Sequence, residues 1–544
     1  PVCLASPLRD VYKRQGLADP VPLDESFFDL GGHSILATRL VFQLRQKLGV
    51  HVPLGLVFDA PTIAQLAAAT DQICSGGADF LIAAPDAAKE NVSSGDLEYA
   101  KDAQALENEL PASFMRAMPA KEPRVVLLTG ATGFLGAYIL ADLLDKRRNH
   151  VEKVYVHVRA NDADSAQQRL RDALAGRGLW CEAWEQEGRV QAVVGDLSKP
   201  HLGLNDADWA HLVEEVHVIV HNGALVHWVY PYSKLRAANV LSTVEVMRLA
   251  NEGQPKSVAF VSSTSALDTE HYIRFSDTSA QGVLESDSLD GSASDLKSGY
   301  GQSKWVAERL LMAAASRGLA TAIIRPGYVV GDSKTAVTNT DDFLFRLIKG
   351  SAQLGLIPDM NNTINMVPVD HVARVTSLAG LAATQWPENR QTHAAVFHVT
   401  SHPTIRYNEF LGALIEYGWN VRPAEYLEWR TALENHVLAS AAAGNTGLDA
   451  DSNALFPLLH FVLDDLPTST KSPELNDANT TKLLTEAHEL DVVRGVDVPL
   501  VGLYLSWLVA VGFLPPPASK SARALPTLPE GVARQAMGRG SAAV

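Results

Sequence analysis

A tyrosine and a lysine, Tyr300 and Lys304, stand four residues apart in a segment that is predicted to be helical. At this spacing two side chains share one face of a helix. A phenol with an ordinary pKa of about 10 is a poor acid at neutral pH, and an adjacent ammonium stabilises its ionised form. Thr264, at the end of a predicted strand, offers a second hydroxyl for the same substrate oxygen. The three side chains predict a site that protonates a carbonyl oxygen, although a lone Y-x-x-x-K is common by chance.

A glycine-rich turn upstream gives that pattern weight. TGATGFLG, at residues 129–136, follows an apolar run and opens a predicted helix. Between a strand and a helix, glycines spaced G-x-x-G-x-x-G let a pyrophosphate approach backbone N–H groups. The alternative is a tight turn without a ligand. We predict a dinucleotide contact formed by Gly130, Thr132, Gly133, Phe134, Leu135 and Gly136.

The end of the second predicted strand indicates which dinucleotide. Enzymes that use NAD usually place an acid there for the ribose 2′-hydroxyl, whereas this strand ends in Arg159, with Arg169 one helical segment later. The guanidinium group of arginine binds phosphate through two parallel N–H groups, so the pair favours NADPH, which carries a 2′-phosphate. Asp162 and Asp164 are also nearby, past the strand end.

The next two predicted strands add further candidates. Asp196, in GDL, is a candidate for binding the adenine amino group, and an exposed turn aspartate is the alternative. Leu197 is assigned to the cofactor site. We assign the segment after the fourth strand, Asn222, Gly223 and Ala224, to the cofactor site. The stretch HWVYPY follows, and its aromatic side chains either line an acyl pocket or pack in a loop; they are His227, Trp228 and Tyr230.

A serine near the amino terminus, Ser34, follows two glycines in LGGHS, where a helix is predicted from about 34 to 48. A helix N-cap is one interpretation. The other is a hydroxyl that carries phosphopantetheine through a phosphodiester, since a helix N-terminus stabilises an anion. The longer stretch DESFFDLGGHSILATRL resembles the carrier domain of peptide-synthetase enzymes. That resemblance implies 4′-phosphopantetheine on Ser34 and a phosphopantetheinyl transferase as a partner.

Alternating elements must position these residues. The β-rich runs, separated by helical segments, are RVVLLTG, VEKVYVHVRA, RVQAVVGDL, VHVIVHNGA, SVAFVSST and TAIIRPGYVV. Strands separated by helices predict an α/β fold with a doubly wound parallel sheet of the Rossmann type. A short helix is also predicted over 62–73 and an amphipathic one near 97–110.

These patterns divide the chain into six expected parts. They are a truncation edge or foreign sequence at 1–15, a small helical-bundle carrier domain at 16–76, a linker with a lead-in helix at 77–122, an NADP-binding Rossmann core at 123–340, a smaller substrate or lid subdomain at 341–517, and a disordered tail at 518–544.

Composition excludes several classes of function. A formal charge of −16 argues against a chain-wide surface for nucleic acid or an anionic membrane. Three cysteines far apart favour neither a disulfide framework nor a metal site, and we expect a cytoplasmic protein. The most apolar stretch, about 125–144, is broken by glycines and an aspartate, which favours a buried strand and helix over a membrane span.

Taken together, the tyrosine, lysine, threonine and glycine turn resemble the thioester reductase branch of the extended short-chain dehydrogenase/reductase superfamily. The resemblance implies that Lys304 also holds the cofactor ribose. A closer resemblance is to the family of fungal α-aminoadipate reductase large subunits. The stretches that carry it are GDLSKPHLGL, HNGALVHWVYPYSKLR, FVSSTSALDTE, SGYGQSKWVAERL, RPGYVVGDS, NTDDFL and NMVPVDHVARV. This family implies reduction of a carrier-bound amino-acid thioester to an aldehyde, and an adenylation domain that precedes the carrier in the parent chain.

Three alternatives stay open. A release domain of a peptide synthetase or a carboxylic acid reductase would give another aldehyde or an alcohol. A sugar-nucleotide epimerase or dehydrogenase would have no use for a carrier. A non-catalytic scaffold would not need the intact trio of Thr264, Tyr300 and Lys304.

Overall fold

The structure is a computed structural model of the chain. It describes residues 23–24, 27, 40–41, 44, 56–57, 60–75, 98–117, 123–227, 230–384, 394–442, 453–455, 462, 466, 470–490, 492–519 and 523–532. Ser34, Trp228, the 1–15 segment and most of the expected carrier domain lie outside these ranges. Within them, α4 (Ile63–Ser75) confirms the short helix predicted after residue 61.

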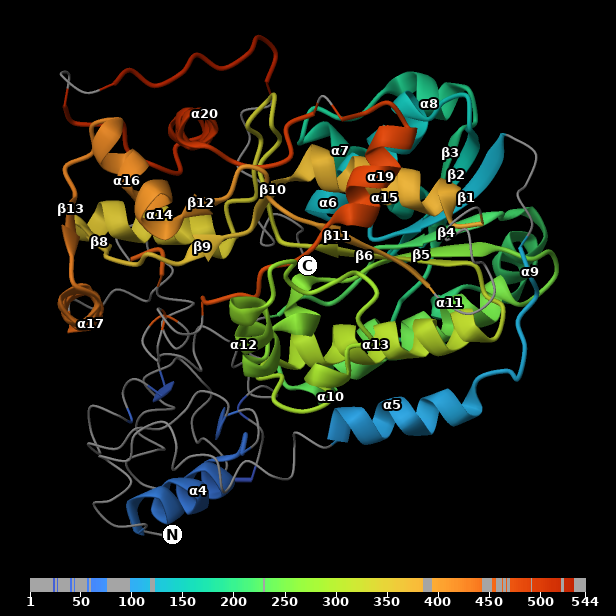
Figure 1. The fold of residues 1–544 in the computed structure, drawn as a ribbon, viewed down its shortest axis with the longest axis horizontal. Coiled ribbons are helices and arrows are strands. Elements are labelled where there is room, and N and C mark those ends of the chain that lie inside the picture. The colour runs from blue at the N-terminus through green and yellow to red at the C-terminus, as the bar shows by residue number, and fades with distance from the viewer. Residues whose placement is uncertain are drawn as a thin grey trace.

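A seven-stranded parallel sheet forms the centre of the molecule, in the order β11-β6-β5-β4-β1-β2-β3 (Figure 1). The strands are β1 (Arg124–Thr129), β2 (Val151–Val158), β3 (Val190–Val194), β4 (Val218–His221), β5 (Ser257–Val261), β6 (Thr321–Pro326) and β11 (Ala395–Val399). All ladders are parallel, so the strands end at one edge, and the strand order reverses between β1 and β4. The doubly wound α/β prediction is confirmed.

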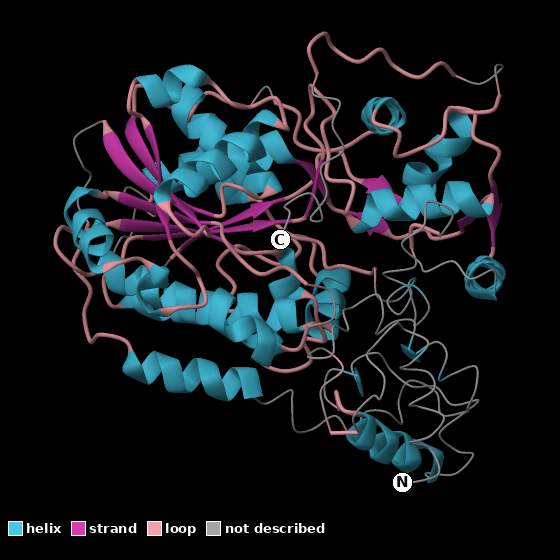
Figure 2. Ribbon diagram, turned by 180° about the vertical axis from the view of Figure 1, so that it is seen from behind, coloured by secondary structure: helices cyan, strands magenta, loops and turns pink. Residues whose placement is uncertain are grey.

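Both faces of the sheet are covered by helices, as Figure 2 shows. Alternate residues of a strand point to opposite faces, and β1 follows this rule: Val125 and Leu127 pack into one core, Val126 and Leu128 into the other. This double burial explains why the strand sequences read as continuous apolar runs.

The first face is covered by α5 (Glu98–Glu109), η4 (Pro200–Gly203), α9 (Asp206–Glu215), α10 (Tyr232–Arg236), η5 (Ala237–Leu241), α11 (Ser242–Ala250), η6 (Thr264–Leu267), α12 (Glu270–Thr278), η7 (Asp290–Ser292) and α13 (Gly299–Ser316). The second face is covered by α6 (Phe134–Ala141), η3 (Asp142–Lys146), α7 (Ala163–Ala175), α8 (Glu182–Gln186), α15 (Val369–Ala382) and α19 (Ala478–Glu486). No helix of the described ranges is long and apolar enough to cross a bilayer.

The lead-in helix α5 belongs to the first face. Tyr99 is fully buried, its hydroxyl donates to Ser292 O at 2.8 Å, and its ring meets the Trp305 ring edge-on at 5.3 Å. Asp102 forms an ion pair with Arg236 at 2.7 Å. The segment leading from the carrier region is therefore fixed to α10 and α13.

The carboxyl-terminal region corrects the expected boundary at residue 340. Strand β11 joins the main sheet beside β6, and α15 and α19 pack on its second face. Without β11 the outer edge of β6 would be unpaired, and without α15 and α19 part of the second face of the sheet would be exposed to solvent.

The remaining elements form a second core beside the sheet. They are α14 (Phe343–Leu354), α16 (Tyr407–Glu416), α17 (Tyr426–Ala442), α20 (Val498–Ala510) and the strand pairs β7 (Tyr328–Val330) with β10 (Met366–Pro368), β8 (Leu356–Pro358) with β13 (Arg422–Ala424), and β9 (Thr363–Ile364) with β12 (Ile405–Arg406).

This second core also corrects the expectation of a disordered tail from residue 518. Leu525, Leu528 and Val532 pack against it. Ser506 donates to the Pro526 carbonyl at 2.7 Å. The segment 523–532 is held because it carries apolar side chains at intervals that reach the α20 surface.

Candidate functional site

The glycine turn joins β1 to α6 with very little space around its backbone. Gly130 has φ +77°, and a Cβ added to it would lie 2.7 Å from the Gly223 Cα. A Cβ on Gly136 would lie 2.1 Å from the Gly130 carbonyl oxygen, and Gly133 N donates to that oxygen at 3.0 Å. Glycine is required at these positions because no side chain fits, which is the property of a turn that brings phosphate to backbone N–H groups.

The two predicted arginines meet at the end of β2. Arg169 Nη1 donates to the Arg159 carbonyl at 2.9 Å, while the Arg159 side chain is exposed and has no ion pair in the described part of the chain. Asp162 is the N-cap of α7 and accepts from Ser165 N at 2.8 Å. Asp162 is thus engaged in capping, and the Arg159 guanidinium is open to an anion.

Asp196, after β3, forms a local turn. Its Oδ1 accepts from the Ser198 N at 2.9 Å and the Ser198 hydroxyl at 2.7 Å. Burial tends to raise the pKa of Asp196, but these hydrogen bonds and the charges of Lys199 and Arg159 hold it below its usual value. The turn alternative accounts for the hydrogen bonds at Oδ1, and a role toward adenine stays a prediction.

The segment after β4 is fixed against the glycine turn. Asn222 Nδ2 donates to Gly130 O at 3.3 Å, and Gly223 N donates to Thr129 Oγ1 at 2.8 Å. His221 lies behind them, 2.9 Å from Thr129 Oγ1, and burial followed by the charge of Lys304 lowers its pKa to about 3. This neutral imidazole holds the two strand ends together.

The other predicted cofactor residues surround the same turn. Leu197 lies over Gly223, its Cδ1 2.7 Å from where a Cβ would stand. The Thr132 carbonyl accepts weakly from Arg177 Nη2 at 3.5 Å. Phe134, Leu135 and Ala224 are half-buried there, at the start of α6 and beyond β4.

Asn239 was missed by the sequence reasoning. It lies in the π-helical turn η5. Its Oδ1 accepts a hydrogen bond from Leu225 N at 2.7 Å, and its Nδ2 donates one to Leu225 O at 3.0 Å. Nδ2 also donates to Ser303 Oγ at 3.0 Å, on α13. Asn239 therefore links the loop after β4 to the helix of Tyr300. Single π-helical turns often mark functional sites, but the sequence carries no signal for one.

Two glycines place Tyr300 between two loops. A Cβ on Gly299 would lie 2.4 Å from the Tyr230 carbonyl oxygen, and one on Gly301 2.7 Å from the Ser265 carbonyl oxygen. The first contact is with the loop after β4, the second with the turn that begins at Thr264. The elements that carry Thr264 and Tyr300 therefore touch at the carboxyl edge of the sheet.

Lys304 lies beneath Tyr300, with its Nζ 5.7 Å from the centre of the tyrosine ring. The ammonium donates to the Val261 carbonyl at 2.7 Å and lies 4.7 Å from the Phe260 ring. Burial lowers the pKa of Lys304 to about 7, against the charge of Glu308. Near neutral pH this amine can hold or release a proton.

A buried ion pair fixes α13 to the sheet. Arg325 Nη2 on β6 lies 2.7 Å from Glu308 Oε2, both side chains are 0% exposed, and Ser262 donates to the same carboxylate. The pair stands one turn beyond Lys304, so α13 cannot rotate or slide without breaking it.

His227 and Tyr230 stack on one another, with ring centres 3.6 Å apart and planes at 13°. Both rings are half-buried beside the Tyr300 helix. The stack is compatible with either alternative, a pocket wall or loop packing.

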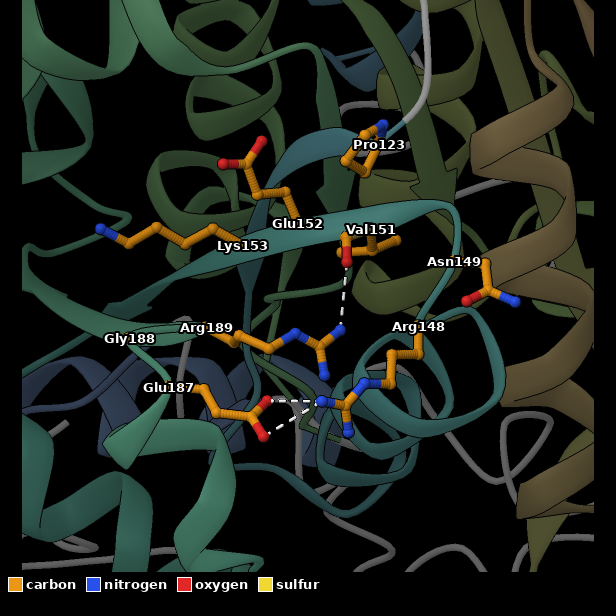
Figure 3. Close-up of a pocket in the computed structure, with 9 residues that line it drawn as sticks. All are labelled: Pro123, Arg148, Asn149, Val151, Glu152, Lys153, Glu187, Gly188 and Arg189. Carbon is orange, nitrogen blue, oxygen red and sulfur yellow. Dashed lines mark hydrogen bonds and ion pairs between the residues drawn. The ribbon is translucent and has the colours of Figure 1, made fainter.

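A pocket of about 440 Å³ lies at the opposite edge of the sheet, where β2 and β3 begin (Figure 3). Its lining includes Arg148 and Glu187, which pair at 2.9 Å, and Arg189, which donates to Val151 O at 3.0 Å. These charges are matched locally, and the pocket is remote from the predicted site.

Two families match the chain. Residues 128–376 match the NAD-binding family described as male sterility protein, and residues 8–70 match the family described as phosphopantetheine attachment site. The first range contains the glycine turn and the trio, and the second contains Ser34.

Among curated proteins, the L-2-aminoadipate reductases of Schizosaccharomyces pombe and Saccharomyces cerevisiae are 46% and 47% identical over 94% and 93% of this chain. The chain spans only 35% and 36% of their lengths. A linear gramicidin synthase of Brevibacillus parabrevis is 35% identical over 86% of the chain, which is 8% of that protein.

Among solved structures, the terminal R domain from the myxalamid PKS-NRPS biosynthetic pathway is 32% identical, with a TM-score of 0.65. The match covers 77% of this chain and 100% of that domain. A thiolation-reductase di-domain from an archaeal non-ribosomal peptide synthetase is 20% identical over 94% of this chain and 98% of its own, with a TM-score of 0.66, and shows likeness of fold alone.

Proposed function

The chain belongs to the family of terminal reductase domains, and from this premise we propose that it reduces an acyl thioester carried on Ser34 to an aldehyde. We infer that the acyl group is L-2-aminoadipyl and the product its 6-semialdehyde, an intermediate of lysine biosynthesis, because two fungal L-2-aminoadipate reductases are 46% and 47% identical over nearly the whole chain. The observation that carries the proposal is the position of Tyr300 between the turn of Thr264 and the loop after β4.

The residues present fit a nicotinamide dinucleotide. Gly130 and Gly223 leave no space for side chains where the pyrophosphate would pass, and Arg159 offers an open guanidinium for a 2′-phosphate. NADPH, when bound, supplies a hydride. The other residues proposed to hold it are Thr132, Gly133, Phe134, Leu135, Gly136, Arg169, Asp196, Leu197, Asn222, Ala224, Tyr300 and Lys304.

The chain's own residues manage the charge that develops on the substrate carbonyl oxygen. As hydride adds to the carbonyl carbon, Tyr300 donates its phenolic proton to that oxygen, and the Thr264 hydroxyl donates a hydrogen bond to it. The carbon–sulfur bond then breaks, the oxygen loses its proton again, and the products are the aldehyde and a thiol on the arm. Lys304 in its ammonium form favours ionised Tyr300 and binds the cofactor ribose. The fixed helix α13 keeps these donors in place, so little reorganisation is needed during the reaction.

The carrier function implies further partners. A phosphopantetheinyl transferase attaches the arm to Ser34, and an adenylation domain of the parent chain loads it with a small amino acid. We further propose that residues 16–76 are the carrier, that α5 is its anchor on the reductase, and that the protein acts in the cytoplasm.

A loading experiment tests the proposal. The transferase and synthetic aminoadipyl-CoA would charge Ser34 in the full chain, NADPH would be added, and the product would be identified by mass spectrometry. We expect the semialdehyde, one NADPH oxidised per arm, and neither loading nor product with Ser34→Ala. Loading of the Ser34→Ala chain, or an unreduced thioester after prolonged incubation with NADPH, contradicts the proposal.

A further inference from the structure

A carboxylate on the lead-in helix α5 binds both ends of the short helix α10, and the two helices lie next to α13 (Figure 1). Asp102 Oδ2 accepts a hydrogen bond from Arg236 Nε at 2.7 Å, and its Oδ1 accepts one from Arg236 Nη2 at 2.8 Å. This is the two-pronged geometry of a strong arginine–carboxylate pair. The Tyr232 hydroxyl donates to the same carboxylate. Tyr232 is the first residue of α10 and Arg236 the last, so one side chain from α5 holds the whole helix.

This contact is largely shielded from solvent. Tyr232 is 6% exposed, and the Asp102 side chain is 17% exposed. Burial tends to raise the pKa of Asp102, but the hydrogen bonds from Arg236 and Tyr232 hold it below its usual value, so the carboxyl group is ionised at neutral pH. Tyr99, about one turn earlier on α5, packs at the same place, with its ring centre 6.4 Å from that of Tyr232. Removing the carboxylate would leave a buried phenol without its acceptor, which is costly.

The position of α10 determines where the loop after β4 lies. This loop, residues 222–231, ends directly at α10. Near its start, the backbone of Leu225 is held by the amide of Asn239, which lies in η5, the direct continuation of α10. The loop is therefore tied at both ends to one helical segment, 232–241. Asp102 ties that segment to α5.

The same loop contacts α13 at the residue before Tyr300. A Cβ on Gly299 would lie 2.4 Å from the Tyr230 carbonyl oxygen and 2.6 Å from Tyr232 N. No side chain separates these backbones, so a displacement of the loop is transmitted directly to the first turn of α13. Tyr230 also carries the ring that stacks on His227, with the ring centres 3.6 Å apart.

We propose that Asp102 is a positioning residue for the reduction, which holds the loop 222–231 against the residue before Tyr300. It acts through Tyr232 and Arg236 and touches neither the substrate nor the cofactor. The inference rests on the proposed function, because it takes Tyr300 as the proton donor. The helix that leads from the carrier region is then part of the support of the reductase site as well as a tether for the carrier.

A second ion pair on the same helix separates positioning from anchoring. Glu107 of α5 pairs with Arg317 at 3.5 Å, and the two side chains are 32% and 25% exposed. Arg317 is the C-cap of α13, at the opposite end from Tyr300. Loss of either ion pair weakens the contact of α5 with the reductase, but only loss of the Asp102 contact reaches the loop.

Hydrogen–deuterium exchange of the full chain compares Asp102→Asn with Glu107→Gln. In Asp102→Asn we expect peptides of the loop 222–231 to exchange about 10-fold faster, the low end for charged hydrogen bonds because the pair is partly exposed. In Glu107→Gln the loop should exchange at the wild-type rate. Tyr232→Phe, which removes one donor oxygen and keeps the ring, should show the change of Asp102→Asn to a smaller degree. Peptides of β1 should keep their protection in all three variants, which shows that the fold is intact.

Turnover gives a second readout. With aminoadipyl on Ser34, Asp102→Asn should lower the single-turnover rate about 10- to 100-fold, because a small misplacement of a catalytic group costs that much, whereas Glu107→Gln should stay close to the wild type. With soluble aminoadipyl-CoA, in which the carrier has no part, Asp102→Asn should lose kcat rather than gain KM.

Three results would overturn the assignment: unchanged loop exchange in Asp102→Asn, a wild-type kcat of that variant on the soluble thioester, or equal losses in Asp102→Asn and Glu107→Gln. A loaded wild-type chain that releases no aldehyde refutes the proposed function itself. The exchange measurement does not depend on activity, so it still decides whether Asp102 holds the loop.

Discussion

Replacing Arg159 by alanine should weaken binding of NADPH much more than binding of NADH. The two cofactors differ only in the 2′-phosphate, and the Arg159 guanidinium stands open at the end of β2 without an ion pair inside the described ranges. Arg169 is expected to act partly through the backbone, because its Nη1 already donates to the Arg159 carbonyl at 2.9 Å.

The size of the effect follows from these contacts. A hydrogen bond to a charged group is worth about 1.5–3 kcal/mol, which corresponds to roughly a 10- to 150-fold change in Kd. Arg159 is exposed, so salt screening favours the lower half of this range at physiological ionic strength. NADH should lose less than about threefold, within the scatter of surface substitutions. Arg169→Ala should weaken both cofactors, since it also frees the loop that follows β2.

Fluorescence or calorimetric titration with each cofactor at two salt concentrations measures these changes. Arg148→Ala, at the opposite edge of the sheet, is the matched control. Equal losses of NADPH and NADH affinity in Arg159→Ala, or a loss that does not shrink in salt, would refute the assignment and make Arg159 a structural residue.

Three further predictions concern the site. Tyr300→Phe should lower the single-turnover rate about 10²- to 10⁴-fold and leave NADPH affinity nearly intact, because only one oxygen is lost; a variant that keeps more than about a tenth of the rate would move the proton donor elsewhere. Lys304 has a pKa of about 7 in the unliganded chain, so its amine is neutral above that pH. If NADPH binding requires the ammonium form, binding should take up a proton at pH 8 but not at pH 6. Calorimetry in buffers of different ionisation enthalpy measures this uptake, and Lys304→Met should abolish it. Gly130→Ala should lower the free energy of unfolding by about 1–3 kcal/mol from backbone strain alone, with a further loss from the contact with Gly223. Urea unfolding measures this loss. Gly412→Ala on α16, where an added Cβ meets no other atom, is the control and should not destabilise the chain.

Much of the central sheet was predictable because its signal is local. Each predicted run became a strand, since most side chains of these doubly buried strands are apolar and glycine or polar residues follow them. Strand β11 was missed because AVFHV is short and contains His398, whose ring is buried beside Arg325 at 3.0 Å. A polar side chain satisfied by a distant partner looks like a surface residue in the sequence.

The site was predictable in its residue types and less so in its supports. The glycines on either side of Tyr300 were a usable signal, because glycine inside a helix costs about 1 kcal/mol and needs a reason such as a close backbone approach. Asn239 gave no such signal, since its hydrogen bonds depend on which loop lies opposite it in the fold.

Deuterium transfer tests the central claim most directly. The full chain, loaded with aminoadipyl on Ser34, would be mixed with NADPH deuterated at one face of nicotinamide C4, and the released product trapped and weighed by mass spectrometry. We predict an aldehyde that carries a single deuterium at the former thioester carbon, from the label on one face only. An aldehyde without deuterium from either label, or an alcohol with two, would contradict the account.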